Sequence, residues 1–344
     1  MAVGIAGAGV FVLAFVSGLL YEQTERARDR QRYPRIGRAI DIGGRTLNID
    51  CEGAGRPAAI LASGANWGTT LAIHDPQTMW ANGGPRPGYS WVTVQRALAS
   101  LTTVCWYDRA GSGWSDMGPY PRDSASHARD LHALLGAARV PPPYVLVGES
   151  SAGLDARVYA GFYPSEVAGL VLVGWADPGI WLGPRSNNGK RAARVLQLVY
   201  RSQDAMAELF NMVGLYRLGP VRPAPAPPQG LTAAEWRTIW FLTHSSKAMS
   251  ALIQDIASWR LSSAEARAAG NLGSRPLLVV SPEHITGPTE FLEAWTSTLS
   301  DLARLSTEGR QITIGGGAND LLYDAPQAIA DAAGQVVQEV RRQH

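Results

Sequence analysis

The chain has 344 residues, of which 46% are hydrophobic and 17% charged, and its net charge is +2. This composition supplies a large core and excludes a disordered or coiled-coil chain. Between Glu22 and Arg38, six arginines face three acidic residues, a local charge of +3 that leaves about −1 elsewhere and no basic face for nucleic acid. Two cysteines are too few for a disulfide-stapled scaffold or a zinc ribbon.

The first predicted element is an uncharged run from Ala2 to Leu20. As a helix it would be about 28 Å long, close to the thickness of the hydrocarbon layer of a membrane. We predict a retained transmembrane helix at residues 2–21, because a cleaved signal peptide normally has basic residues before a shorter apolar run. The arginine-rich linker at residues 22–37 favours a cytoplasmic body for this single-pass membrane protein.

The rest of the chain alternates apolar strand-like runs with helical patterns. The expected strands are Arg38–Ile42, Thr46–Cys51, Ala58–Ala62, Thr103–Tyr107, Tyr144–Val147, Leu170–Val173, Leu277–Val280 and Gln311–Ile314. The expected helices are Val92–Ser100, Ala125–Ala138, Leu154–Tyr163 and Ala325–Arg341. Gly43 and Gly44 join the first two strands as a hairpin. This order predicts an α/β fold with a mostly parallel, eight-stranded, doubly wound sheet.

One long segment is predicted to be a helical cap. Residues 176–270 are too many for a loop, so we expect an inserted cap between core segments 38–175 and 271–344. The segment is rich in large apolar side chains, namely Trp181, Met206, Phe210, Met212, Tyr216, Trp236, Trp240 and Trp259. Most should pack between cap and core, and a few should line an apolar cleft. The expected partner is therefore a small to medium apolar substrate.

The motif that carries chemistry follows the fifth predicted strand. Gly148-Glu149-Ser150-Ser151-Ala152 matches the nucleophile elbow G-x-S-x-G, with Ala152 at the final glycine. The strained turn needs small residues two positions before and after the serine, and Gly148 and Ala152 are small. Such a turn lifts the Ser150 hydroxyl above the sheet and directs the backbone N–H of Ser151 toward a developing oxyanion.

With this motif the sequence resembles the α/β-hydrolase superfamily, in particular its lipase-, haloperoxidase- and epoxide-hydrolase-like branch. Three further segments support the resemblance. Residues 107–116 are similar to the D-x-R-x-G-x-G-x-S loop after the fourth strand, residues 163–172 to the approach to the sixth strand, and Asp324-Ala325-Pro326 to the D-x-P before the last helix. The resemblance spans residues 36–340 and implies the α/β-hydrolase fold.

The resemblance also assigns the second oxyanion donor. Gly64 and Ala65, after the third strand, would supply a backbone N–H by position. Asn66 and Trp67 either face the substrate or cap and pack the loop.

The usual partners of the serine are missing. The histidine position of the family falls on Asn319, and no histidine occurs between Ile285 and Gln343. Asparagine cannot accept a proton near neutral pH. The two acid positions of the family align with Ile285 and Gly174, so the usual acid is absent as well.

A relocated base is one explanation, and the candidates are His284, beside Glu283, and His74. Chemistry without an acyl-enzyme is another, with Asp320, Asp177 or Glu149 as acid or base and Asn319 as a hydrogen-bond donor.

The predicted function is a serine-hydrolase-like enzyme acting on an ester-type or similar apolar substrate, with Ser150 as nucleophile. A lyase, isomerase or cyclase on the same scaffold and a non-catalytic ligand-binding protein remain as alternatives. We expect no cofactor and no metal, because no metal-ligand spacing and no dinucleotide-binding glycine pattern is present.

The resemblance finally implies that the strands carrying Cys51 and Cys105 are antiparallel neighbours, which brings the two sulfurs close. Two buried thiols are the simpler expectation. A disulfide is the alternative, and it would place the body in an oxidising compartment rather than the cytoplasm.

Overall fold

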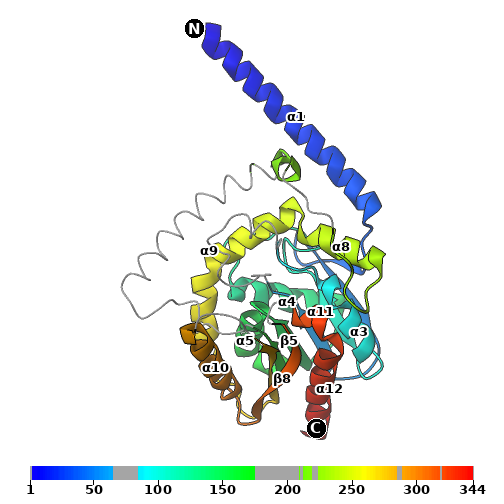
Figure 1. Ribbon diagram of the computed structural model, residues 1–344, viewed down its shortest axis with the longest axis vertical. Coiled ribbons are helices and arrows are strands. Elements are labelled where there is room, and N and C mark those ends of the chain that lie inside the picture. The colour runs from blue at the N-terminus through cyan, green and yellow to red at the C-terminus, as the bar shows by residue number, and fades with distance from the viewer. Residues whose placement is uncertain are drawn as a thin grey trace.

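The computed structural model describes residues 2–64, 84–174, 209, 212–218, 224–284, 289–317 and 320–343. A central sheet with helices on both faces forms the body, and the N-terminal helix α1 (Ala2–Arg32) extends away from it (Figure 1).

The sheet has eight strands in the order β1-β2-β4-β3-β5-β6-β7-β8. Their bounds are β1 Arg38–Asp41, β2 Thr46–Glu52, β3 Ala58–Ala62, β4 Val104–Tyr107, β5 Tyr144–Glu149, β6 Val167–Val173, β7 Leu277–His284 and β8 Gly309–Gly317. From β4 to β8 all neighbours are parallel, whereas β2 pairs antiparallel with both β1 and β4. The predicted eight-stranded sheet is confirmed, and it is mixed because β2 runs opposite to the other strands. The Gly43-Gly44 hairpin before β2, with both glycines at positive φ, makes the first of these reversals.

Helices cover both faces of this sheet. Their bounds are α3 Val92–Leu98, α4 Ser124–Ala138, α5 Ala152–Phe162, α8 Ala233–Thr243, α9 Ser246–Ala268, α10 Thr289–Ala303, α11 Leu321–Asp324 and α12 Pro326–Gln343, with short 3-10 turns at Gly88–Trp91, Pro164–Glu166 and Leu215–Leu218. Helices α4, α5 and α10 share one apolar cluster with the sheet, and α3, α8 and α12 share the other. Because both faces are covered, every residue of β3 and β4 is buried.

Side-chain caps stabilise the N-termini of several helices. The Asp123 side chain accepts a hydrogen bond from Ser126 N at the start of α4. Thr232 and Glu235 form a reciprocal capping box at the start of α8, and Ser245 caps α9. Helices α8 and α9 form an arch over the body (Figure 1). They belong to the described part of the predicted cap, whereas residues 176–208 lie outside the described residues.

The predicted transmembrane helix is not supported. Helix α1 does not end near residue 21 but continues through the arginine-rich residues to Arg32, where a juxtamembrane linker was expected. In the part of the chain that the structure describes, no helix combines the length and the apolarity needed to cross a membrane. The side chains of residues 2–11, half of the predicted span, lie outside the described part.

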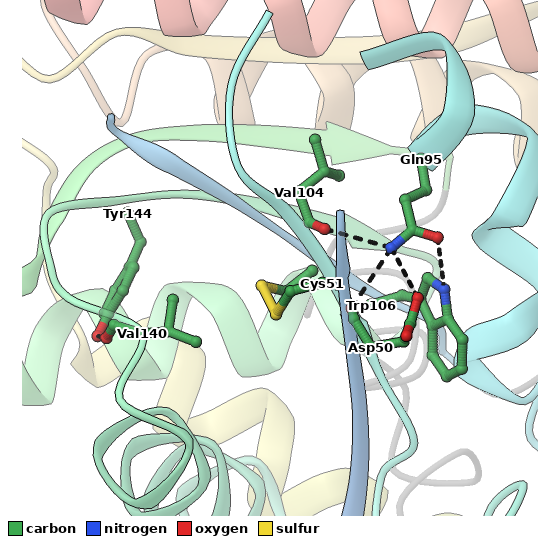
Figure 2. The surroundings of a disulfide bond; sticks show 8 residues. Asp50, Cys51, Gln95, Val104, Trp106, Val140 and Tyr144 are labelled. Carbon is green, nitrogen blue, oxygen red and sulfur yellow. Dashed lines mark hydrogen bonds between the residues drawn. A yellow bond between two sulfur atoms is a disulfide. The ribbon is translucent and has the colours of Figure 1, made fainter. Parts of the chain in front are cut away.

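The two cysteines form a disulfide, so the expectation of two buried thiols is wrong. Cys51 and Cys105 are direct partners in the antiparallel pairing of β2 with β4, and their Cα atoms are 4.1 Å apart. Figure 2 shows the bond beside a second link between the same strands and α3: Gln95 donates to Val104 O and to Asp50 and accepts from the Trp106 indole. Covalent and polar links together hold β2 in the sheet.

Candidate functional site

The predicted elbow lies between β5 and α5. Ser150 has a φ of +53°, in the left-handed region that few residues other than glycine adopt. Its N–H donates to Val173 O at 2.9 Å, and its carbonyl accepts from Gly153 N at 3.1 Å. A Cβ on Gly148 would lie 2.7 Å from Ala152 O, so this position requires glycine. The backbone therefore has the strained strand-turn-helix form that the motif predicts.

Gly64 closes the other side of the elbow. A Cβ at this position would lie 2.5 Å from both Glu149 O and Ser151 N, so a glycine lets the two loops touch. The Gly64 N–H, expected to be an oxyanion donor, donates to Glu149 Oε2 at 3.3 Å. The other residues predicted for this loop, Ala65, Asn66, Trp67 and His74, lie outside the described residues.

A buried arginine that the sequence analysis did not single out joins this corner to the loop after β8. Arg86 Nη1 lies 3.3 Å from Glu149 Oε1, and Nη2 lies 2.8 Å from Asp320 Oδ1. Its guanidinium carbon is 5.1 Å from the centre of the Tyr323 ring, and its side chain is only 3% exposed. No sequence motif surrounds Arg86, so the sequence does not mark this residue. Once its burial is known, the need of a buried arginine for charged partners identifies it.

The charges of this cluster change the proton affinity of its members. Burial raises the pKa of Asp320 to about 6, and the nearby carboxylates of Glu149 and Asp324 add to the rise, while Arg86 opposes it. Burial and the charge of Asp320 raise the pKa of Tyr323 to about 12, again against the effect of Arg86. Asp320 therefore changes charge near pH 6, whereas Tyr323 stays neutral at physiological pH.

The structure does not bring all predicted site residues together. Ser150, Ser151, Gly64, Glu149 and Asp320 share one corner. The Glu283 side chain is exposed near the end of β7, where its Oε2 lies beside β8. The backbone of His284 pairs with Gly317, and its side chain lies outside the described part. Asn319, Asp177 and Trp181 lie wholly outside the described residues.

A second buried polar cluster joins α5 to α4 and α9. Arg109 contacts Asp155 on α5 at 3.2 Å and Asp255 on α9 at 2.8 Å. His127 Nδ1 lies 2.9 Å from Asp155, and Ser124 Oγ donates to the same carboxylate at 2.6 Å. These charge-assisted contacts hold the pKa of Asp155 below its usual value although burial alone would raise it.

A cavity of about 10 Å³, enough for about one water molecule, adjoins this second cluster. It is lined by Ile60, Ala62, Tyr107, His127, Ala128, Leu131, Leu146, Val147, Ala152, Asp155 and Ala156. Ser150 is not among these lining residues. Among the described residues, no three His, Cys, Asp or Glu side chains are placed to hold a metal ion.

Comparisons with known proteins agree with this architecture. A family model described as "alpha/beta hydrolase fold" matches residues 81–201, which confirms the resemblance to that superfamily. The haloalkane dehalogenase DbeA from Bradyrhizobium elkani has a similar structure, with a TM-score of 0.61 and 16% identity, over 89% of this chain and 99% of its own. An esterase from Thermogutta terrifontis gives a TM-score of 0.55 and 20% identity over 89% and 99% of the two chains. At such identities the likeness establishes the fold alone.

Among curated proteins, the uncharacterized protein YbdG of Bacillus subtilis is 22% identical over 166 residues, which are 48% of this chain and 46% of the relative. The chain spans less than half the length of the curated relatives it matches.

Proposed function

We propose that this chain, which has the α/β-hydrolase fold, is a hydrolase that cleaves an ester-type bond in an apolar substrate, with Ser150 as the nucleophile. The observation that carries the proposal is the elbow: a non-glycine residue at a φ of +53°, held between β5 and α5 and closed by Gly64. Backbone strain of this kind persists where the surrounding structure enforces it and is frequent at active sites.

The reaction needs a base, because a serine hydroxyl is a weak nucleophile at neutral pH. We assign this role to Asp320, on the loop that carries the base in related folds. With a pKa of about 6, its carboxylate is ionised at neutral pH and more basic than an ordinary aspartate. In this scheme Ser150 Oγ attacks the ester carbonyl and gives its proton to Asp320. The proton then passes to the departing alcohol, and water releases the acid from Ser150.

Aromatic side chains of the cap support an apolar substrate. Trp236 on α8 packs edge-on against Tyr323 with ring centres 5.2 Å apart, and Trp240 lies 5.9 Å from Trp236. Because Tyr323 also lies under Arg86, these mostly buried rings lie next to the charged cluster.

The test is labelling with a fluorophosphonate probe, together with hydrolysis of p-nitrophenyl esters of increasing acyl length. Wild type and Ser165→Ala, a variant at an exposed serine after α5, should both be labelled. Ser150→Ala should not be labelled. Because the base must be deprotonated, labelling should rise as the pH increases through about 6. Absence of labelling in the wild type, or equal labelling of Ser150→Ala, would exclude Ser150 as the nucleophile.

A second candidate function is proton-transfer chemistry without an acyl-enzyme, as in a lyase or isomerase. One observation favours it: the carboxylates of Glu149 and Asp320 converge on a single buried guanidinium. In that case Asp320→Asn would abolish turnover, while Ser150→Ala would retain it.

A further inference from the structure

Hydrogen bonds of the main chain fix the segment around Arg86 independently of its side chain. Ser112 Oγ donates to Arg86 O at 2.9 Å, and Arg86 N donates to Gly64 O at 3.4 Å. Two residues later, Gly88 N donates to the buried Asp108 carboxylate at 2.6 Å. The segment is thus attached both to the loop after β4 and to the loop after β3.

The guanidinium then joins the end of β5 to the loop after β8. One arm reaches Glu149, the residue before the nucleophile, and the other reaches Asp320, the residue after the usual base position. Glu149 in turn accepts the Gly64 N–H through its second oxygen. Arginine suits this place because its rigid planar fork can hold two acceptors at once and stack on a ring, whereas lysine carries a single point charge.

We propose that Arg86 is the positioning residue of this site. It fixes Glu149 between the elbow and the loop that carries Gly64, and it holds Asp320 as the carboxylate that takes the proton of Ser150. The proposal rests on the function proposed above. It adds that the base depends on an arginine from the β3–α3 connection rather than on a histidine-acid pair.

The charges facing Asp320 fix the direction in which each substitution should shift its pKa. They are Arg86, Glu149 and Asp324, beside the neutral phenol of Tyr323. Arg86 is the cation of this group, and it favours the ionised form of Asp320, whereas the two carboxylates oppose it. Removing Arg86 and removing the charge of Glu149 should therefore shift the titration of Asp320 in opposite directions, which a merely structural role would not do.

The experiment measures the pH dependence of fluorophosphonate labelling of the full chain. Arg86→Met should move the midpoint upward by about one to three pH units, the usual effect of a close opposite charge. Glu149→Gln should move it downward. Arg86→Lys should give a smaller upward shift, with a lower kcat for ester hydrolysis and a KM within about twofold of wild type. The control Arg304→Met, at a 73% exposed side chain, should leave the midpoint unchanged.

A second measurement does not depend on activity. Difference infrared titration of the carboxyl band, with Asp320→Asn as the reference, should show the same opposite shifts in Arg86→Lys and Glu149→Gln. These two variants decide the matter even where Arg86→Met does not fold. If the pH midpoint of labelling is the same in both variants as in wild type, the role of Arg86 alone is overturned. An unlabelled wild type would instead overturn the proposed function, and the two failures are distinguishable.

Discussion

At the scale of single residues, the elbow depends on glycines that permit close approach. A Cβ on Gly64 would meet backbone atoms of Glu149 and Ser151 at 2.5 Å, and backbone cannot move aside as a flexible side chain can. By contrast, nothing lies within 4 Å of a Cβ built on Gly136, which is exposed on α4. The same substitution should thus have opposite effects at the two positions.

We expect Gly64→Ala to lower the free energy of unfolding by about 1–3 kcal/mol, the usual cost of overpacking, and to slow labelling of Ser150. Gly136→Ala should raise stability by up to about 1 kcal/mol, because alanine is the better helix former. Urea denaturation of both variants measures the effects. Equal stability of the two would mean that the Gly64 loop can relax away from the elbow.

At the scale of elements, one face of α9 holds the core by polar contacts. Ser258 Oγ and Ser262 Oγ accept the backbone N–H groups of Arg122 and Ser124, and Glu265 accepts that of Ala125. The spacing 258, 262, 265 places the three side chains on one side of the helix. They satisfy donors at the start of α4, so α9 is fixed to the core.

Arg109 is the charged link in the same attachment. Arg109→Met would leave Asp155 and Asp255 buried without their cation, and we expect a loss of about 3–5 kcal/mol in the free energy of unfolding. Arg304→Met, which breaks an exposed pair on α10, should cost less than about 1 kcal/mol. Denaturant titration compares the two. A loss below about 1 kcal/mol for Arg109→Met would show that the carboxylates find other partners.

Lys247, at the start of α9, gives the attachment a pH dependence. Its ammonium donates to Gly113 O at 2.8 Å and Ser115 O at 2.7 Å. Burial lowers the pKa of Lys247 from 10.5 to about 8, although Asp108 and Asp116 oppose the shift. Between these values the unfolded lysine holds a proton that the folded one has lost, so this group makes the protein more stable as the pH rises.

We therefore expect the stability of wild type relative to Lys247→Met to increase as the pH rises from 8 to 10.5. Below pH 8 both states keep the proton, and the difference should be flat. Unfolding in urea across this range provides the curve. A difference that stays constant above pH 8 would mean that the folded lysine keeps its ordinary pKa.

At the scale of the whole molecule, the disulfide ties the outer part of the sheet to its centre. Cys51 and Cys105 are 54 residues apart, so the bond closes a long loop that includes β3 and α3. A bond of this kind is typical of oxidising compartments. It argues against the cytoplasmic side that the arginines near the N-terminus favour.

Replacing both cysteines by alanine should lower the free energy of unfolding by about 2–4 kcal/mol, chiefly because the unfolded chain gains freedom. Thiol counting on the unfolded, unreduced protein should find no free thiol. Two free thiols would restore the cytoplasmic prediction and remove this contribution to stability.

The sequence alone predicted the strands along the chain and the place of the elbow. Both follow from local physics: apolar periodicity sets strands and helices, and the small residues Gly148 and Ala152 specify the turn at Ser150. The disulfide could only be offered as an alternative, because it depends on the register of β2 against β4, which places Cys51 directly opposite Cys105. The cluster around Arg86 was not predicted at all. Its partners are 63 and 234 positions away in the numbering, and only the folded chain brings their charges together.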